Sequence, residues 1–276
     1  MTEISQRESA EVEAANSSGR QPVVFVHGLW LLANSWDSWR KHFDEAGYAT
    51  LAPGWPDDSE TVVEGNQHPE GFAGKTVGQV ADHVQSVIAG LTMPPAIIGH
   101  SFGGLLVQIL AGRGLAKATV AIDPAPFRGV LPLPLSALKS AWPVLRNPAN
   151  RNRAVALTYE QFRYGFTNAV EPDEAKDLHE RFAVPGSGRT IFQAATANFN
   201  PRTDAKVDSR NRDRGPLLII SGEKDLTVPW AIANASYKKQ KRNAAVTEIV
   251  EIAGRGHSLT IDHGWREVAD AALGFV

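Results

Sequence analysis

The chain contains no cysteine and only two methionines, and its acidic and basic residues almost balance. Without cysteine there is no disulfide framework, no thiolate metal site and no cysteine nucleophile. With 28 Lys and Arg against 30 Asp and Glu, the formal net charge is −2, so we expect no nucleic-acid partner. No uninterrupted run of about 18 apolar residues occurs, so we expect no membrane span. The 276 residues suit one domain with an insertion better than two equal domains.

The first 20 residues are polar and of mixed charge. They lack the basic start, the apolar stretch and the small-residue cleavage site of a secretory signal. We therefore predict a flexible N-terminal tail over residues 1–20 and a cytoplasmic location.

From residue 22 onward, patterns typical of strands and helices alternate. The predicted strands are 22–28, 48–53, 95–100, 118–124, 216–222 and 246–254. The predicted helices are 35–46, 76–91, 102–112, 230–241 and 264–275. Between 125 and 214 the alternation stops, and Pro-rich pieces and helical patterns such as 157–166 take its place. This predicts an α/β fold with a mostly parallel, doubly wound sheet, in which 21–124 and 215–276 form the core and 125–214 a mainly helical cap.

The strongest local signal is GHSFGG at residues 99–104, between a predicted strand and a predicted helix. A serine on a sharp strand-to-helix turn has strained backbone angles and close neighbours, so the flanking Gly99 and Gly103 fit the requirement. Such a turn lifts the Ser101 hydroxyl above the carboxyl edge of the sheet. It also points the first amides of the next helix at the site.

A serine hydroxyl needs a base, and the base needs a third group to fix its tautomer. His257 follows the last predicted strand and Asp225 follows the strand before it, so both are expected at the same sheet edge as Ser101. The chain order Ser, Asp, His is typical of this kind of triad. Asp123 also ends a strand and stays open as an alternative acid.

A tetrahedral intermediate requires hydrogen-bond donors for its oxyanion. The first candidate is the backbone N–H of Phe102, directly after the nucleophile. The second is the N–H of Leu29, in the loop after the first strand. We interpret His27, which precedes that loop, as structural.

The sequence resembles the α/β-hydrolase superfamily. The resemblance rests on four motifs spread over most of the chain: VVFVHGLW at 23–30, GHSFGG at 99–104, SGEKDLTVP at 221–229 and GRGHSL at 254–259. It implies an α/β-hydrolase fold with Ser101 as nucleophile, His257 as general base and Asp225 as orienting acid. It also implies no cofactor, no metal, and a cap at 125–214 that sets specificity.

The resemblance leaves the substrate open. We expect a small-molecule ester and place Trp30, His100, Phe127 and Trp230 at the substrate pocket. The first hypothesis is a serine hydrolase that cleaves carboxylic esters, including lactones and amides, through an acyl-enzyme. The alternatives are a non-hydrolytic enzyme of the same fold (a lyase, a transferase or a cofactor-free oxygenase) and a ligand receptor that retains the triad. The oligomeric state is not predicted.

Overall fold

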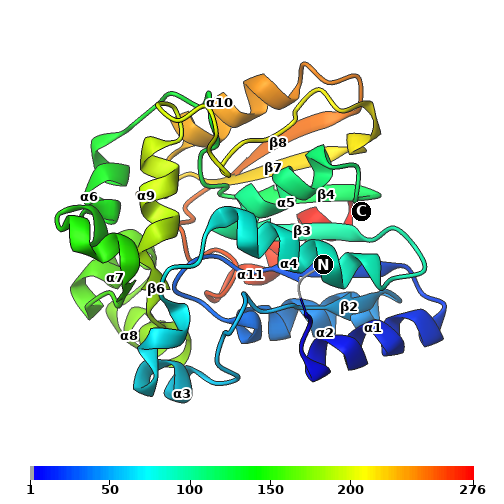
Figure 1. Cartoon of the computed structure of the whole chain (residues 1–276), viewed down its shortest axis with the longest axis horizontal. Helices are drawn as coiled ribbons and strands as arrows, with labels where there is room; N and C mark the ends of the chain where they lie inside the picture. Colours follow the sequence, from blue (N-terminus) through cyan, green and yellow to red (C-terminus); the bar gives the residue numbers. More distant parts are fainter. Residues whose placement is uncertain (1–2) are drawn as a thin grey trace.

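A six-stranded parallel sheet forms the centre of the protein (Figure 1). The computed structural model describes residues 3–276. The strands lie in the order β2-β1-β3-β4-β7-β8. Their bounds are β1 Pro22–Val26, β2 Ala49–Leu51, β3 Ala96–His100, β4 Ala118–Ile122, β7 Leu217–Gly222 and β8 Thr247–Ile252. All six predicted strands are present and all pair in parallel, which confirms the predicted fold class.

The central strands are apolar on both faces because helices cover both sides of the sheet. Every residue of β1, β3, β4 and β7 is buried, whereas the edge strand β8 is half exposed. Successive side chains of a strand point to opposite faces. Val24 and Val26 accordingly pack into one hydrophobic cluster, and Val23 and Phe25 pack into the other.

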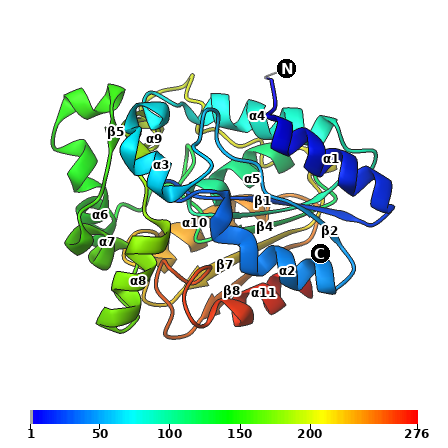
Figure 2. The ribbon, with the colours of Figure 1, turned by 90° about the horizontal axis from the view of Figure 1, so that it is seen from below.

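The helices form two layers around the sheet. Their bounds are α1 Gln6–Ser18, α2 Asp37–Glu45, α3 Val62–Gln67, α4 Val77–Ala89, α5 Phe102–Gly112, α10 Trp230–Gln240 and α11 Trp265–Leu273. Residues of α1, α4, α5 and α10 belong to one core cluster, and residues of α2 and α11 belong to the other. Figure 2 shows α1 and α4 on one side of the sheet and α2 and α11 on the opposite side.

The prediction of a flexible tail over residues 1–20 is wrong for residues 6–18, which form α1. Ser5 and Glu8 form a capping box at the start of this helix, and Val12 and Ala15 are buried in the core. Its apolar positions are few, and the helix is held mainly by polar contacts to residues far along the chain. Local composition cannot show such contacts. Residues 1 and 2 lie outside the described part of the chain.

The segment between β4 and β7 is mainly helical, as expected. It contains α6 Leu135–Leu145, η3 Pro148–Asn152, β5 Ala154–Val155, α7 Tyr159–Gly165, α8 Pro172–Phe182, β6 Gly186–Ser187, α9 Gly188–Thr196 and η4 Arg212–Arg214. Two short 3-10 helices lie elsewhere, η1 Ala33–Trp36 and η2 Pro69–Phe72. Helices α6 to α9 gather beyond one end of the sheet (Figure 1). The division of the chain into a core and a cap at 125–214 remains a prediction.

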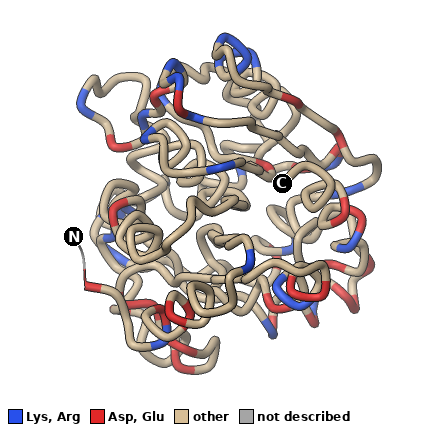
Figure 3. The backbone as a smooth tube through the Cα atoms, turned by 90° about the vertical axis from the view of Figure 1, so that its right-hand side faces the viewer, with Lys and Arg blue, Asp and Glu red and all other residues tan. Residues whose placement is uncertain are grey.

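Charged residues of both signs are interspersed along the backbone on the side seen in Figure 3, in keeping with the near-zero net charge. Over residues 3–276, no helix combines the length and the apolar character that crossing a bilayer would require.

Candidate active site

Ser101 lies on a strained turn between β3 and α5. Its φ of 57° and ψ of −118° fall where residues other than glycine are rare. A Cβ atom at Gly99 would lie 2.3 Å from the Gly103 carbonyl oxygen, and one at Gly103 would lie 2.0 Å from the Val26 carbonyl oxygen. Because both contacts are with backbone atoms that cannot move aside, neither glycine can be replaced without distorting the turn.

The structure brings Ser101, His257 and Asp225 into direct contact. The Nε2 atom of His257 lies 2.9 Å from Ser101 Oγ, and its Nδ1 atom lies 2.6 Å from Asp225 Oδ2. All three side chains are buried. Since a carboxylate only accepts hydrogen bonds, Nδ1 carries the proton, and Nε2 is free to accept the proton of the serine hydroxyl.

Asp225 is itself held in position by the backbone that follows it. Its Oδ1 atom accepts hydrogen bonds from the N–H groups of Thr227, at 2.7 Å, and Val228, at 2.8 Å. These contacts leave Oδ2 to face the imidazole of His257. Three short hydrogen bonds therefore fix the orientation of this buried carboxylate.

Asp123 lies behind this site and does not bond to the imidazole. It is buried, with a φ of 39°, and its Oδ1 atom accepts the N–H of Gly222 at 2.8 Å. Burial, together with the nearby carboxylate of Asp225, raises the pKa of Asp123 well above its ordinary value. A neutral carboxyl group stabilises an imidazolium poorly, so the geometry favours Asp225 over Asp123 as the acid.

His100 packs against the imidazole of His257, with ring centroids 4.6 Å apart. Burial, and then the neighbouring His257, lower the pKa of His100 well below its usual value, so this ring is neutral. Ligand atoms of His100, Asp123 and His257 lie within 4.8 Å of one another, as in a possible metal site. Both nitrogens of His257 are already bonded to Ser101 and Asp225, so a metal would have to break the triad.

The two predicted oxyanion donors flank Ser101. Phe102 begins α5, so its N–H has no acceptor within the helix. The loop carrying Leu29 abuts the serine, since a Cβ at Gly28 would lie 2.9 Å from Ser101 Cβ. Over residues 3–276, neither the Leu29 nor the Phe102 amide donates a hydrogen bond to another protein group. Two unengaged donors beside one hydroxyl are the arrangement that a developing oxyanion requires.

A cavity of about 560 Å³ opens onto Ser101. Trp30 and Phe127 line it, as predicted, whereas His100 and Trp230 do not. His100 is buried behind His257, and Trp230 begins α10 with its side chain outside the cavity lining. The expectation that these two residues contact substrate is therefore not supported.

The sequence analysis missed most of the wall of this cavity. The missed residues come from the Pro-rich stretch and α6 (among them Val130, Leu131, Leu133, Ala141 and Leu145), from α9 (Ile191 and Ala194) and from the start of α10 (Ile232). The apolar run from 130 to 145 was the available signal, but nothing local indicates that it folds over Ser101. Among residues 3–276, no charged side chain lines the cavity.

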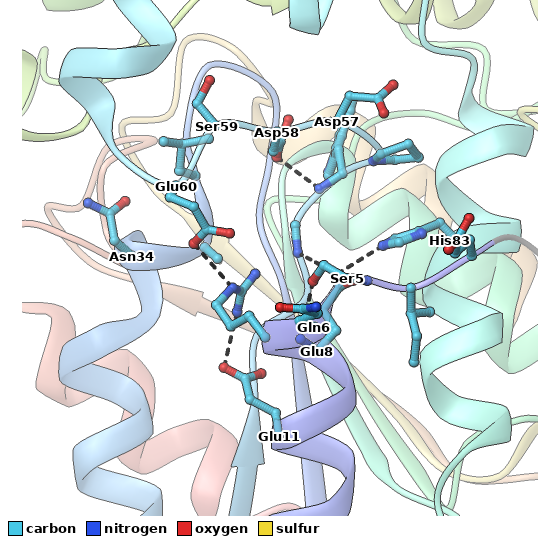
Figure 4. Close-up of a pocket in the computed structure, with 18 of the residues that line it drawn as sticks. Ser5, Gln6, Glu8, Glu11, Asn34, Asp57, Asp58, Ser59, Glu60 and His83 are labelled. Atoms are coloured by element: carbon cyan, nitrogen blue, oxygen red, sulfur yellow. Dashed lines mark hydrogen bonds and ion pairs between the residues drawn. The ribbon is translucent and has the colours of Figure 1, made fainter.

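A second, polar cleft of about 660 Å³ lies between α1 and the loop 54–60 (Figure 4). Its charged groups are mostly paired, for example Arg7 with Glu11 and Glu60. Within the described residues, no serine that lines this cleft bonds to a histidine, so we do not assign the reaction to it. Its loop instead supports the oxyanion side of the active site, because Asp58 Oδ2 lies 3.1 Å from Nε2 of the buried His27.

Comparison with known proteins places the chain in a family. The model of the alpha/beta hydrolase family matches residues 23–271. The chain therefore belongs to the α/β-hydrolase family, as its motifs predict.

Solved structures similar to this chain differ in their activities. A monoacylglycerol lipase from Paleococcus ferrophilus is 20% identical, with a TM-score of 0.62 over 92% of each chain. A pyrethroid hydrolase from Sphingobium faniae is 18% identical, with a TM-score of 0.65 over 92% of this chain and 96% of the other. A putative non-heme bromoperoxidase from Mycobacterium tuberculosis is 17% identical, with a TM-score of 0.64 over 92% and 91%. At these identities the likeness shows the fold alone.

Proposed function

We propose that the protein is a serine hydrolase that cleaves carboxylic esters through an acyl-enzyme. The observation that carries the proposal is the continuous chain of contacts from Ser101 Oγ through the His257 imidazole to the Asp225 carboxylate, at 2.9 and 2.6 Å. Ser101, at one end of this series of contacts, faces an apolar cavity. It also lies beside the backbone N–H groups of Leu29 and Phe102, which donate to no other protein group within residues 3–276.

The proposed reaction begins with attack of Ser101 Oγ on the ester carbonyl carbon while Nε2 of His257 removes the hydroxyl proton. The imidazolium that forms is stabilised by Asp225. It then gives the proton to the departing alkoxide, which leaves as an alcohol. Water, activated by the same imidazole, attacks the acyl-serine, and the carboxylic acid is released with Ser101 restored.

The amides of Leu29 and Phe102 stabilise the negatively charged oxygen in both tetrahedral intermediates. Each such donor lowers the barrier by about 3–4 kcal/mol in comparable sites. Because both donors are backbone groups held by β1 and α5, no side chain has to reorganise during the reaction.

The cavity indicates a neutral substrate with a bulky apolar group. Its lining is aliphatic and aromatic, with only a few polar side chains such as Ser140, Asn198 and Thr227. A charged substituent on the acyl or the alcohol part of the ester would lose its hydration in this cavity and find no oppositely charged side chain there.

The test compares the wild type with Ser101→Ala on p-nitrophenyl esters of two to twelve acyl carbons. We expect the variant to lose at least about 10⁴-fold in kcat/KM. Mass spectrometry after treatment with a fluorophosphonate should find one adduct on the wild type, at Ser101. Ser17→Ala, which changes an exposed serine of α1 outside the cavity, is the matched control and should keep full activity.

Ester turnover retained by pure Ser101→Ala would contradict the proposal. A wild type that is labelled at Ser101 yet hydrolyses no ester, lactone or amide would instead favour a non-hydrolytic enzyme. Tight binding of an apolar ligand with less than about one turnover per minute would favour a receptor.

A further inference from the structure

Large apolar side chains are exposed on the segments that line the cavity. The exposed fractions are 74% for Leu131, 65% for Leu133, 83% for Leu135, 59% for Trp142 and 88% for Phe199. We call these five residues the apolar rim. Leu131, Leu133 and Phe199 also line the cavity that reaches Ser101, so the rim is continuous with the site. Single exposed apolar residues need no explanation, but a group of them at one opening indicates an interaction surface.

The chain around the rim is strongly basic. Residues 124–159 contain no Asp or Glu, although the whole protein has a net charge of −2. The same stretch contains five exposed cations: Arg128, Lys139, Arg146, Arg151 and Arg153. Within the described residues, none of the five forms an ion pair. Lys139 Nζ lies 4.0 Å from the centroid of the Tyr164 ring, but no carboxylate neutralises any of the five charges within the described residues.

Helix α6 combines both features on one face. Leu135, Lys139, Trp142 and Arg146 are spaced by four, three and four residues, and all four are exposed. At 3.6 residues per turn, this spacing places them along one side of the helix. Large apolar side chains and cations that are exposed together on one helix are suited to contact with an anionic membrane surface, where the first enter the interface and the second approach the headgroups. Figure 1 shows α6 at the outer end of the molecule, away from the sheet.

We propose that the apolar rim and the exposed face of α6 bind an anionic lipid surface, with the cavity mouth turned towards it. The apolar side chains would enter the interface, and Lys139 and Arg146 would contact anionic headgroups. A second copy of the chain fits less well, because a two-fold contact would set this basic surface against itself. The binding step needs no catalysis. Its use, the delivery of apolar esters from the lipid into the cavity, rests on the proposed esterase function.

The test is co-sedimentation of the whole protein with vesicles. Vesicles of phosphatidylcholine with 30% phosphatidylglycerol should bind it, and pure phosphatidylcholine vesicles should bind it at least about tenfold more weakly. Lys139→Gln/Arg146→Gln should weaken binding to the anionic vesicles about 10- to 30-fold, as expected for the loss of two headgroup contacts. Leu135→Ser/Trp142→Ser should weaken binding to both kinds of vesicle.

A matched control removes the same charge elsewhere. Lys238→Gln/Arg242→Gln changes two exposed cations at the end of α10 and should bind like the wild type. Circular dichroism shows whether each variant is folded. Sedimentation measures membrane binding and not catalysis. The binding result can therefore be interpreted even if the protein turns out not to be an esterase.

Two outcomes would overturn the proposal. One is equal binding, or none, to the two kinds of vesicle at millimolar lipid. The other is a dimer in sedimentation velocity that Leu135→Ser/Trp142→Ser abolishes, since the rim would then be an interface between copies of the chain.

Discussion

Removing the charge of Glu8 should destabilise the protein, although the sequence predicts that this residue belongs to a flexible tail. Its carboxylate is buried, lies 2.9 Å from His83 Nε2 on α4 and accepts the N–H of Gly54 at 3.2 Å. Burial by itself raises the pKa of Glu8, but the hydrogen bonds from His83 and from Ser5 outweigh it and lower the pKa from 4.5 to about 2.

The size of the effect follows from this shift. A shift from 4.5 to about 2 corresponds to about 3 kcal/mol of preference for the ionised form in the folded state. The group borders the solvent-filled polar cleft, so we reduce the figure to roughly 2 kcal/mol to allow for screening. Because the pKa is lower in the folded state, this stability is present above pH 4.5 and is lost as the pH falls towards 2.

The perturbation is Glu8→Gln, and the assay is urea unfolding followed by tryptophan fluorescence at several pH values. We expect a free energy of unfolding about 2 kcal/mol lower than that of the wild type at pH 7, with the two curves converging below pH 4.5. Glu13→Gln, an exposed position on the same helix, should stay within about 0.5 kcal/mol of the wild type. If Glu8→Gln unfolds at the same urea concentration as the wild type at pH 7, the contacts of α1 do not stabilise the fold as argued.

Four further substitutions test other parts of the structure. Gly103→Ala would place a Cβ 2.0 Å from the Val26 carbonyl oxygen, so we expect little folded protein and at least 100-fold less labelling by a fluorophosphonate; near-normal labelling would refute the strained turn. Phe162→Ala removes a fully buried ring of α7 and should cost about 3–5 kcal/mol in urea unfolding, whereas a loss below 1 kcal/mol would mean that α7 is not packed as described. Asp225→Asn should lower kcat/KM for a p-nitrophenyl ester about 10⁴-fold, and Asp123→Asn, which replaces a neutral group, should lower it less than tenfold; the reverse order would make Asp123 the acid.

The sheet could be predicted from the sequence because its signals are local. The apolar run at 22–28 becomes β1, and the stripe of valines and isoleucines over 76–91 becomes α4, each within about two residues of the expected ends. The glycines around Ser101 could be recognised because their spacing is a local pattern, although the contact that excludes a side chain at Gly103 is with the distant Val26 carbonyl oxygen. Asp225 and His257 could be assigned because both follow parallel strands, whose ends meet at one edge.

The parts that could not be predicted depend on contacts between distant residues. Helix α1 is fixed by Glu8, whose partners His83 and Gly54 give no local sign of the interaction. The cavity wall depends on how the segment 130–145 folds back over Ser101, which no periodicity encodes. Trp230 is predicted to lie at the pocket, but it is not among the residues that line the cavity.

The insertion leaves and rejoins the sheet at two rigid junctions. At its start, the N–H of Ala125 donates to the Ser101 carbonyl oxygen at 2.9 Å, so the outgoing chain is clamped to the residue proposed as nucleophile. At its end, Gly215 has a φ of 74°, and a Cβ there would lie 2.9 Å from the Lys117 carbonyl oxygen. Between these anchors the segment supplies most of the residues that line the cavity, so we expect substitutions there to change which ester the cavity accepts.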